Sequence, residues 1–110
     1  MESKTAVSAL GALAHETRLA IFRLLVRAGA AGLSVGRIAE ALAIEANGRL
    51  SFHLKELVAA KLASSRQEGR FVYYAANYPE MNELLRYLTE DCCGLGCGEV
   101  VETCNPEHCT

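Results

Sequence analysis

The stretch NGRLSFHLKELVAAKL, residues 47–62, decides the fold, because it predicts one helix with a buried face and a presented face. At 100° per residue, one arc holds four apolar residues and a lysine: Leu50, Leu54, Leu57, Val58 and Lys61. The opposite arc holds Arg49, Ser51, Phe52, Lys55 and Glu56. Cations, a small hydroxyl and a flat apolar ring suit phosphates and base edges. We interpret the segment as a DNA recognition helix; taken alone, it also fits an ordinary amphipathic surface helix.

The charge distribution points to the same region. The whole chain of 110 residues is slightly acidic, with 11 Lys and Arg against 13 Asp and Glu. Residues 49–70, however, carry five basic and two acidic residues, a net charge of +3, whereas residues 90–110 carry five acidic residues and no Lys or Arg. A polyanionic partner would therefore meet the middle of the chain and not its end.

The length of the chain and the positions of its cysteines limit the classes of protein that it can belong to. A chain of 110 residues makes one small domain with a modest core, which favours an oligomer. No apolar run approaches the roughly 18 residues that a membrane span needs, so we expect a cytoplasmic protein without a membrane partner. All five cysteines follow position 91. In a reducing compartment, clustered thiols more often serve metal binding or redox chemistry than structural disulfides.

Helical periodicity recurs on both sides of the recognition segment. Residues 5–13 predict a short helix with a narrow apolar stripe, and residues 16–26 predict the central core helix with Arg18, Arg23 and Arg27 pointing outward. The Gly-containing segment 28–33 ends that helix. Ser34 is a suitable N-cap for a helix over residues 35–42, and a turn at 43–46 leads into the recognition helix.

After Lys61 the pattern becomes alternating. Segments 63–67 and 70–75 flank Glu68-Gly69, a dipeptide that favours a two-residue hairpin turn. The hairpin would carry Arg66 and Arg70 at its tip, where they either lie on DNA phosphates or form a solvated turn. Helix, turn, helix and basic hairpin together indicate a winged helix-turn-helix, a mainly α (α+β) fold of about five helices with a two-stranded wing.

The last predicted helix indicates a dimer. It opens at Pro79, and its apolar residues recur at helical spacing with no further element to cover them. Such a stripe buries most simply against a second copy of the chain, together with the first helix. The expected homodimer interface comprises Leu10, Met81, Leu84, Leu85 and Leu88.

Three blocks of the sequence resemble the ArsR/SmtB family of metalloregulatory repressors: LAHETRLAIFRLL (residues 13–25), LSFHLKELVAAKLA (50–63) and RQEGRFVYY (66–74). They occur in the order and spacing of the family, and the resemblance covers residues 5–90. It implies a homodimeric repressor that binds a palindromic operator in double-stranded DNA and lets go when its inducer binds. It implies no catalysis.

The chain departs from the family at the start of the recognition helix. The family usually begins this helix with a Ser/Thr pair, where this chain has Ala46 and Gly48, so we expect Asn47 to cap the helix instead. A common family His is replaced by Phe52, which can contact a thymine methyl but cannot donate a hydrogen bond. The candidate DNA-contacting residues are Asn47, Arg49, Ser51, Phe52, His53, Lys55, Arg66 and Arg70, with a structural role as the alternative for His53.

The inducer must be inferred from the cysteines. The third helix has no Cys to match one thiolate site of the family, and the last helix lacks the Asp/His pairs of its zinc and cobalt sensors. The chain instead has DCCGLGCG, in which Cys92 and Cys93 follow the last helix and Cys97 lies four residues on. Three sulfurs around one soft ion fit arsenic(III) or antimony(III), and glycines let the chain fold back. A subset of the family resembles this arrangement, sensing arsenite through C-terminal cysteines.

Several alternatives stay open at this point. Cys104 could replace Cys97 as the third ligand, because a longer loop costs little more to close. Zinc, another soft divalent metal or thiol oxidation could replace the metalloid, since Cys92, Cys93 and Cys97 with Cys104 or His108 offer four zinc donors. We expect residues 1–91 to form the DNA-binding and dimerisation domain and residues 92–110 to form an inducer-binding tail.

Two other classes of protein fit the sequence less well. A thiol enzyme such as an arsenate reductase would need an anion-cradling loop ahead of a helix, or a base placed near a Cys, and the sequence shows neither. A winged helix that binds a protein partner instead of DNA is the other alternative.

Overall fold

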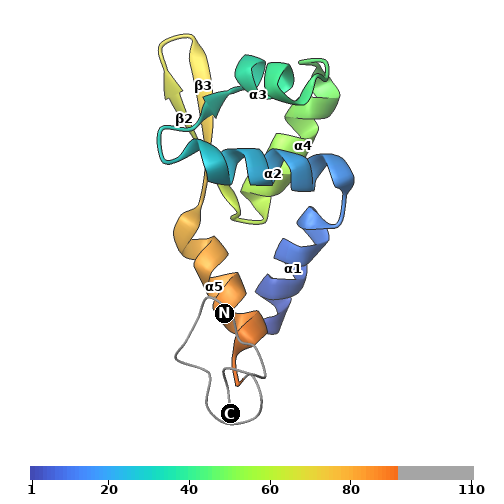
Figure 1. The fold of residues 1–110 in the computed structure, drawn as a ribbon, viewed down its shortest axis with the longest axis vertical. Helices are drawn as coiled ribbons and strands as arrows, with labels where there is room; N and C mark the ends of the chain where they lie inside the picture. The colour runs from blue at the N-terminus through green and yellow to red at the C-terminus, as the bar shows by residue number, and fades with distance from the viewer. Residues whose placement is uncertain (92–110) are drawn as a thin grey trace.

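The computed structural model describes residues 1–91, and it confirms a winged helix-turn-helix with five helices and a hairpin wing. The elements in chain order are α1 (Ser3–Leu13), α2 (Glu16–Ala28), β1 (Leu33–Ser34), α3 (Val35–Leu42), α4 (Gly48–Ala59), β2 (Ala63–Glu68), β3 (Phe71–Ala76) and α5 (Tyr78–Thr89). Figure 1 shows α1 and α5 at one end of the domain and α2 across its middle. At the other end lie α3, the start of α4 and the wing, which is the β2–β3 hairpin.

Side-chain caps explain where the helices of the DNA-binding half begin. The Ser34 hydroxyl accepts a hydrogen bond from the Arg37 amide at 3.3 Å, as expected for the start of α3. The Asn47 side-chain oxygen accepts from the amides of Arg49 at 3.0 Å and Leu50 at 3.3 Å, which confirms Asn47 as the cap of α4. Each such cap typically contributes about 1 kcal/mol, so polar side chains fix the N-terminal ends of both α3 and α4.

The core lies between α2, α3 and α4. α2 contributes two fully buried residues and α4 contributes three, which matches the predicted central helix and the predicted buried arc. Burying one such side chain contributes roughly 1.5–3 kcal/mol. The largest fully buried side chains are Ile21, Leu25, Ile38, Leu50, Leu54, Leu57 and Leu62.

The recognition helix is shorter than predicted. It ends at Ala59, and Lys61, which the helical wheel placed on the buried arc, is exposed with a left-handed φ of 67°. The Leu62 amide donates to the Leu57 carbonyl at 3.0 Å and the Lys61 amide donates to the Val58 carbonyl at 2.9 Å, the two hydrogen bonds of a Schellman ending. The chain therefore turns sharply into β2.

The wing turn is displaced by one residue from the prediction. Glu68 pairs with Phe71, so the two loop residues are Gly69 and Arg70 and not Glu68 and Gly69. Gly69 takes a φ of 64° in the first loop position, where a two-residue turn favours glycine. As a result, Glu68 belongs to β2, and Arg70 is the charged residue of the two-residue turn.

The sheet contains a strand that the sequence did not predict. Its order is β1-β3-β2, with Leu33 opposite Tyr74 and Ser34 opposite Tyr73. Gly32 leads into β1 with a φ of 75°, and a Cβ there would lie 2.5 Å from the Tyr74 carbonyl oxygen. Two residues are too few to show an alternating pattern, but their pairing makes β3 the central strand.

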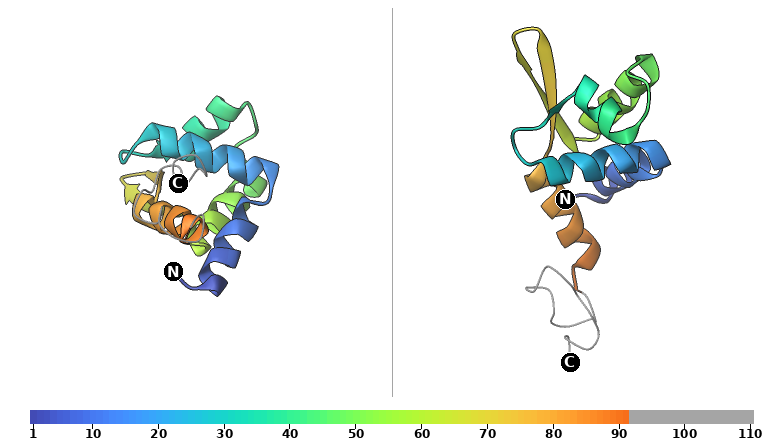
Figure 2. Two further views of the ribbon diagram at one scale, coloured as in Figure 1. Left: turned by 60° about the horizontal axis from the view of Figure 1, so that its bottom comes forward. Right: turned by 45° about the horizontal axis from the view of Figure 1, so that its top comes forward.

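The first and last helices of the described chain, α1 and α5, contact each other. The Ser3 hydroxyl and the Tyr87 hydroxyl are 2.6 Å apart, which joins α1 to α5, and the right view in Figure 2 shows α5 extending in the opposite direction from the wing. Among the described helices, none combines the length and the apolar composition that crossing a bilayer requires.

Candidate nucleic-acid interface

The presented face of α4 carries most of the side chains assigned to DNA. Arg49, Phe52 and Lys55 are exposed and Ser51 is half-buried, as the helical wheel predicted. Phe52 keeps 54% of its surface exposed, although burial would favour such a ring. Within residues 1–91, the Arg49 and Lys55 side chains form no ion pair. Two cations that lack partners in the described domain and one apolar ring thus share one surface.

His53 is not on that face, so its assignment to DNA contact is wrong. Only 7% of its surface is exposed, and its ring packs against the His15 ring with centroids 4.6 Å apart. Burial lowers the pKa of His53, and the nearby charges of His15, Arg18 and Arg49 lower it further. The wheel put His53 at the edge of the apolar arc, and the N-terminal part of α2 covers that edge.

Arg66 does not extend from the wing tip as predicted. Its Nε donates to a Glu68 carboxylate oxygen at 2.6 Å, and its Nη2 donates to the Ala31 carbonyl at 2.9 Å. Its guanidinium also lies 5.2 Å from the centre of the Tyr73 ring. Arg66 therefore fastens the wing to the loop after α2. Arg70, in the turn itself, has no hydrogen bond or ion pair within the described domain.

Arg18 also departs from its predicted outward position. Its side chain is 16% exposed and lies 3.9 Å from the Glu56 carboxylate on α4. Its Nε is buried and has no hydrogen-bond partner in the described residues. This loose pair links α2 to the outer side of the recognition helix, a contact between residues 38 positions apart that periodicity could not reveal.

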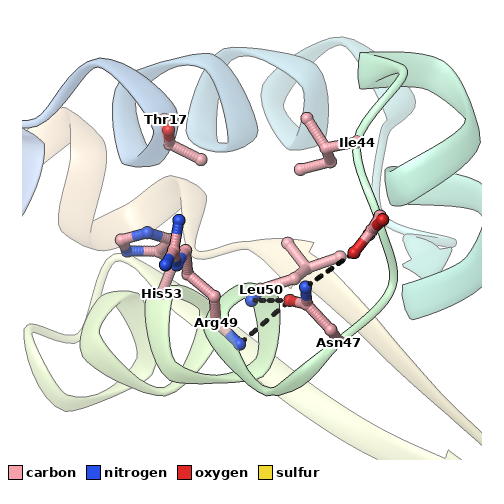
Figure 3. A pocket seen from close by; sticks show the side chains of 7 residues that line it. Thr17, Ile44, Asn47, Arg49, Leu50 and His53 are labelled. Carbon is pink, nitrogen blue, oxygen red and sulfur yellow. Dashed lines mark hydrogen bonds between the residues drawn. The ribbon is translucent and has the colours of Figure 1, made fainter.

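A hollow of about 340 Å³ lies beside the start of α4. Figure 3 shows Thr17 of α2 and Ile44 of the α3–α4 turn across this space from Arg49 and His53 of α4. Asn47 also lines the hollow. Its side chain caps α4 and, in addition, donates a hydrogen bond to the Glu45 carboxylate at 3.2 Å. The sequence did not indicate Thr17, Ile44 or Glu45 as lining residues. The packing of α2 against α4 brings Thr17 here, and the path of the α3–α4 turn brings Ile44 and Glu45.

The other end of the domain exposes a second set of apolar side chains. Val7 and Leu10 of α1 and Leu85 and Leu88 of α5 are between 41% and 68% exposed, and we call these four residues the α1/α5 surface. Leu84, which was expected on the interface, is 5% exposed because the protomer's own core covers it. Met81 is partly buried against that core. Val7 was not among the expected interface residues.

The predicted inducer ligands Cys92, Cys93, Cys97 and Cys104 lie outside the described residues. Within residues 1–91, no group of three His, Cys, Asp or Glu side chains is placed to hold a metal ion. The cysteines follow directly after α5, the helix that carries half of the α1/α5 surface.

Comparisons with known proteins agree with this fold. A family model described as a helix-turn-helix domain matches residues 13–66, which run from the last residue of α1 into β2. No curated protein matches the chain. Among solved structures, an ArsR-like transcriptional regulator from Rhodococcus is 30% identical with a TM-score of 0.71, over 83% of this chain and 82% of that one.

Two further structures extend the comparison. HlyU from Vibrio cholerae is 32% identical with a TM-score of 0.64, over 84% of this chain and 99% of that one. A homodimeric winged helix-turn-helix DNA-binding domain from Mycobacterium bovis, described as a possible ArsR-family regulator, is 25% identical with a TM-score of 0.62. That match covers 80% of this chain and 81% of the other.

Proposed function

This chain belongs to the ArsR family of winged helix-turn-helix transcriptional regulators, and from that premise we propose that it is a homodimeric repressor released from its operator by arsenic(III) or antimony(III). The family consists of DNA-binding regulators and not of enzymes. The proposal adds three parts to this family membership: the surface that contacts DNA, the surface that pairs two protomers, and the inducer.

The DNA contact is proposed for α4 and the wing tip. Arg49, Lys55 and Phe52 present two cations and an apolar ring from one helix face, a combination that suits phosphates and thymine methyls in a major groove. Arg70 adds a cation at the adjacent wing tip, where a phosphate can reach it. Arg66 is excluded from this set, because its guanidinium is already bound within the wing.

The pairing of protomers is proposed for the α1/α5 surface. Its four side chains are exposed although they are apolar, and the helices that carry them lie at the opposite end of the domain from the start of α4 and the wing. The relative from Mycobacterium bovis is a homodimer. A two-fold pair formed through α1 and α5 would leave both recognition helices free to meet successive major grooves about 34 Å apart.

The inducer is inferred from one observation, which is that all five cysteines of the chain come after α5, beginning with Cys92 and Cys93 close to its end. Thiolates prefer soft ions, and the pair Cys92 and Cys93 with Cys97 supplies three sulfurs within six positions. An ion bound there would act at the end of the helix that carries Leu85 and Leu88, and so on the angle between protomers. Release needs only a coupling free energy of about 1–3 kcal/mol.

The test is to titrate arsenite, antimonite and zinc separately against a preformed complex of the reduced protein with its operator. We expect the metalloids to release the DNA. Cys92→Ser or Cys93→Ser should bind the operator normally and not release it, because a hydroxyl replaces a soft donor. Cys109→Ser is the matched control and should release normally.

Comparing Cys97→Ser with Cys104→Ser identifies the third ligand, since only the variant that lacks a ligand loses induction. Normal release by both Cys92→Ser and Cys93→Ser would refute the metalloid assignment. Release by zinc alone would make the protein a divalent-metal sensor.

Thiol oxidation is the second candidate signal. One similar structure, 32% identical, is described as reduced HlyU from Vibrio cholerae, which makes the redox state a relevant variable for a related protein. Diamide should then release the operator complex in the absence of any metalloid, and dithiothreitol should restore it. An operator complex that resists diamide but dissociates with arsenite would eliminate this candidate.

A further inference from the structure

Phe71 is an aromatic residue that the domain leaves largely exposed. It is the first residue after the wing turn, and 59% of its surface is exposed. The neighbouring aromatic ring, Tyr73, lies on the same side of β3 with its centroid 6.5 Å away. Burial of Phe71 therefore contributes little to the stability of the domain, and its position at the tip needs another explanation.

The residues around Phe71 would allow a polyanion to approach it. Arg70 precedes it in the turn and has no ion pair within the described residues. Glu68 faces Phe71 across the strands, but the Arg66 guanidinium binds its carboxylate at 2.6 Å. The Glu68 carboxylate, the acidic group next to the Phe71 ring, is thus neutralised by Arg66 of the same strand. The charge that remains at the wing tip is the positive charge of Arg70.

The wing is also held in a fixed position. β3 pairs with β1 on one side and β2 on the other, and Arg66 ties β2 to the Ala31 carbonyl at 2.9 Å. Figure 1 shows the wing tip on the same side of the molecule as α3 and the start of α4. A ring carried on such a support keeps its direction when the wing meets a surface, which a flexible loop would not ensure.

We propose that Phe71 is a second sequence-reading residue, which packs into the minor groove next to the major groove occupied by α4. This inference rests on the DNA contact proposed above and is continuous with that surface. Apolar side chains that enter a minor groove separate base steps that unstack easily, such as TA. Phe71 would thereby read the sequence flanking each half-site, while Arg70 beside it contacts a phosphate.

The experiment starts from a duplex that the wild-type protein selects from a random-sequence library. Two versions keep the selected half-sites and differ only in the flanks, which contain either TA steps or G·C-rich sequence. Binding of the wild type is expected to favour the TA flanks about tenfold. 2-Aminopurine placed at the flanking step should brighten when the protein binds, because the step unstacks.

Phe71→Ala should abolish both the flank preference and the fluorescence rise. The slope of affinity against salt should stay unchanged, since no charge is removed. Phe52→Ala is the matched control, an aromatic residue of similar exposure on α4, and it should alter preference within the half-site while keeping the flank effect. Phe71→Leu should keep part of the preference, because it retains apolar volume without the flat ring.

The inference is overturned if wild type and Phe71→Ala show the same flank preference and the same fluorescence. It is also overturned if Phe71→Ala changes the sedimentation of the free protein, because the ring would then serve contact between copies. Failure of the proposed function has a different signature: the wild-type protein would select no duplex from the library.

Discussion

The two ends of this domain both expose apolar side chains, but in different surroundings. Leu85 and Leu88 accompany Val7 and Leu10 on two helices that lie side by side. Phe52 and Phe71, equally exposed, stand apart on α4 and on the wing, next to Arg49, Lys55 and Arg70 in the chain region of net positive charge.

The contrast shows that exposure alone does not identify a partner. Aliphatic side chains from two adjacent helices can bury against an identical set, because the same surface complements itself around a two-fold axis. Aromatic rings separated by cations suit a partner that offers phosphates on its outside and flat bases within. The charges beside an exposed apolar residue therefore indicate which kind of partner it meets.

The largest expected effect comes from disrupting the α1/α5 surface, through which we propose that two protomers pair. Leu85→Asp would place a carboxylate in each half of the two-fold interface and remove two leucines from it, at a cost of several kcal/mol. Analytical ultracentrifugation should then find a monomer, and operator affinity should fall steeply because two half-sites are no longer bound together. Leu19→Asp, at a leucine of similar exposure on α2, is the control and should sediment like the wild type. A Leu85→Asp protein that remains a dimer would place the interface elsewhere.

A smaller effect is expected at the DNA end, where the two wing arginines should behave differently. Arg70→Ala should weaken binding to all sequences and lower the salt slope by about one unit, whereas Arg70→Lys should keep most of the affinity. Arg66→Lys should bind as weakly as Arg66→Ala, because an ammonium cannot reproduce the fork that joins Glu68 to the Ala31 carbonyl.

Fluorescence anisotropy at several salt concentrations measures both the affinity for DNA and its dependence on salt. Equal tolerance of lysine at the two wing positions would mean that Arg66 acts through its charge and not by positioning the wing.

The smallest effect concerns His53 of α4, whose ring packs against His15 at the start of α2. The folded state lowers the pKa of His53 below its ordinary value of about 6.5, chiefly through burial, so the folded protein binds fewer protons there than the unfolded chain. The stability linked to His53 is present above pH 6.5 and is lost as the pH falls below it. Urea unfolding between pH 8 and pH 5 should show this decline, and His53→Gln should reduce it. An identical decline in His53→Gln would assign the effect to other groups.

Local patterns predicted the elements that carry the interface. The spacing of Leu50, Leu54 and Leu57 defined the buried side of α4, and thereby the exposure of Arg49 and Phe52, because a helix has one fixed period. Asn47 was identified as a cap because the helix start lacked Ser or Thr, and a cap acts over only three residues.

The remaining features depend on tertiary packing. Arg66 reaches a carbonyl 35 positions away, and His53 is covered by His15, which lies 38 positions earlier. β1 exists only because β3 lies beside it. The sequence contains no periodic signal for any of these contacts, and the helical wheel, which put His53 at the edge of the apolar arc, could not show that His15 covers it. The cysteine ligands remain a prediction from sequence.

The pairing of Ser3 with Tyr87 across 84 positions has a consequence for biosynthesis. A ribosome delivers α1 first and α5 after every other described element, so the surface that α1 and α5 share exists only once α5 has been made. A nascent or truncated chain that ends before α5 can complete neither this contact nor the surface with Leu85 and Leu88. If the α1/α5 surface pairs two protomers as proposed, nonsense mutations upstream of α5 should be recessive, because their products would lack half of that surface.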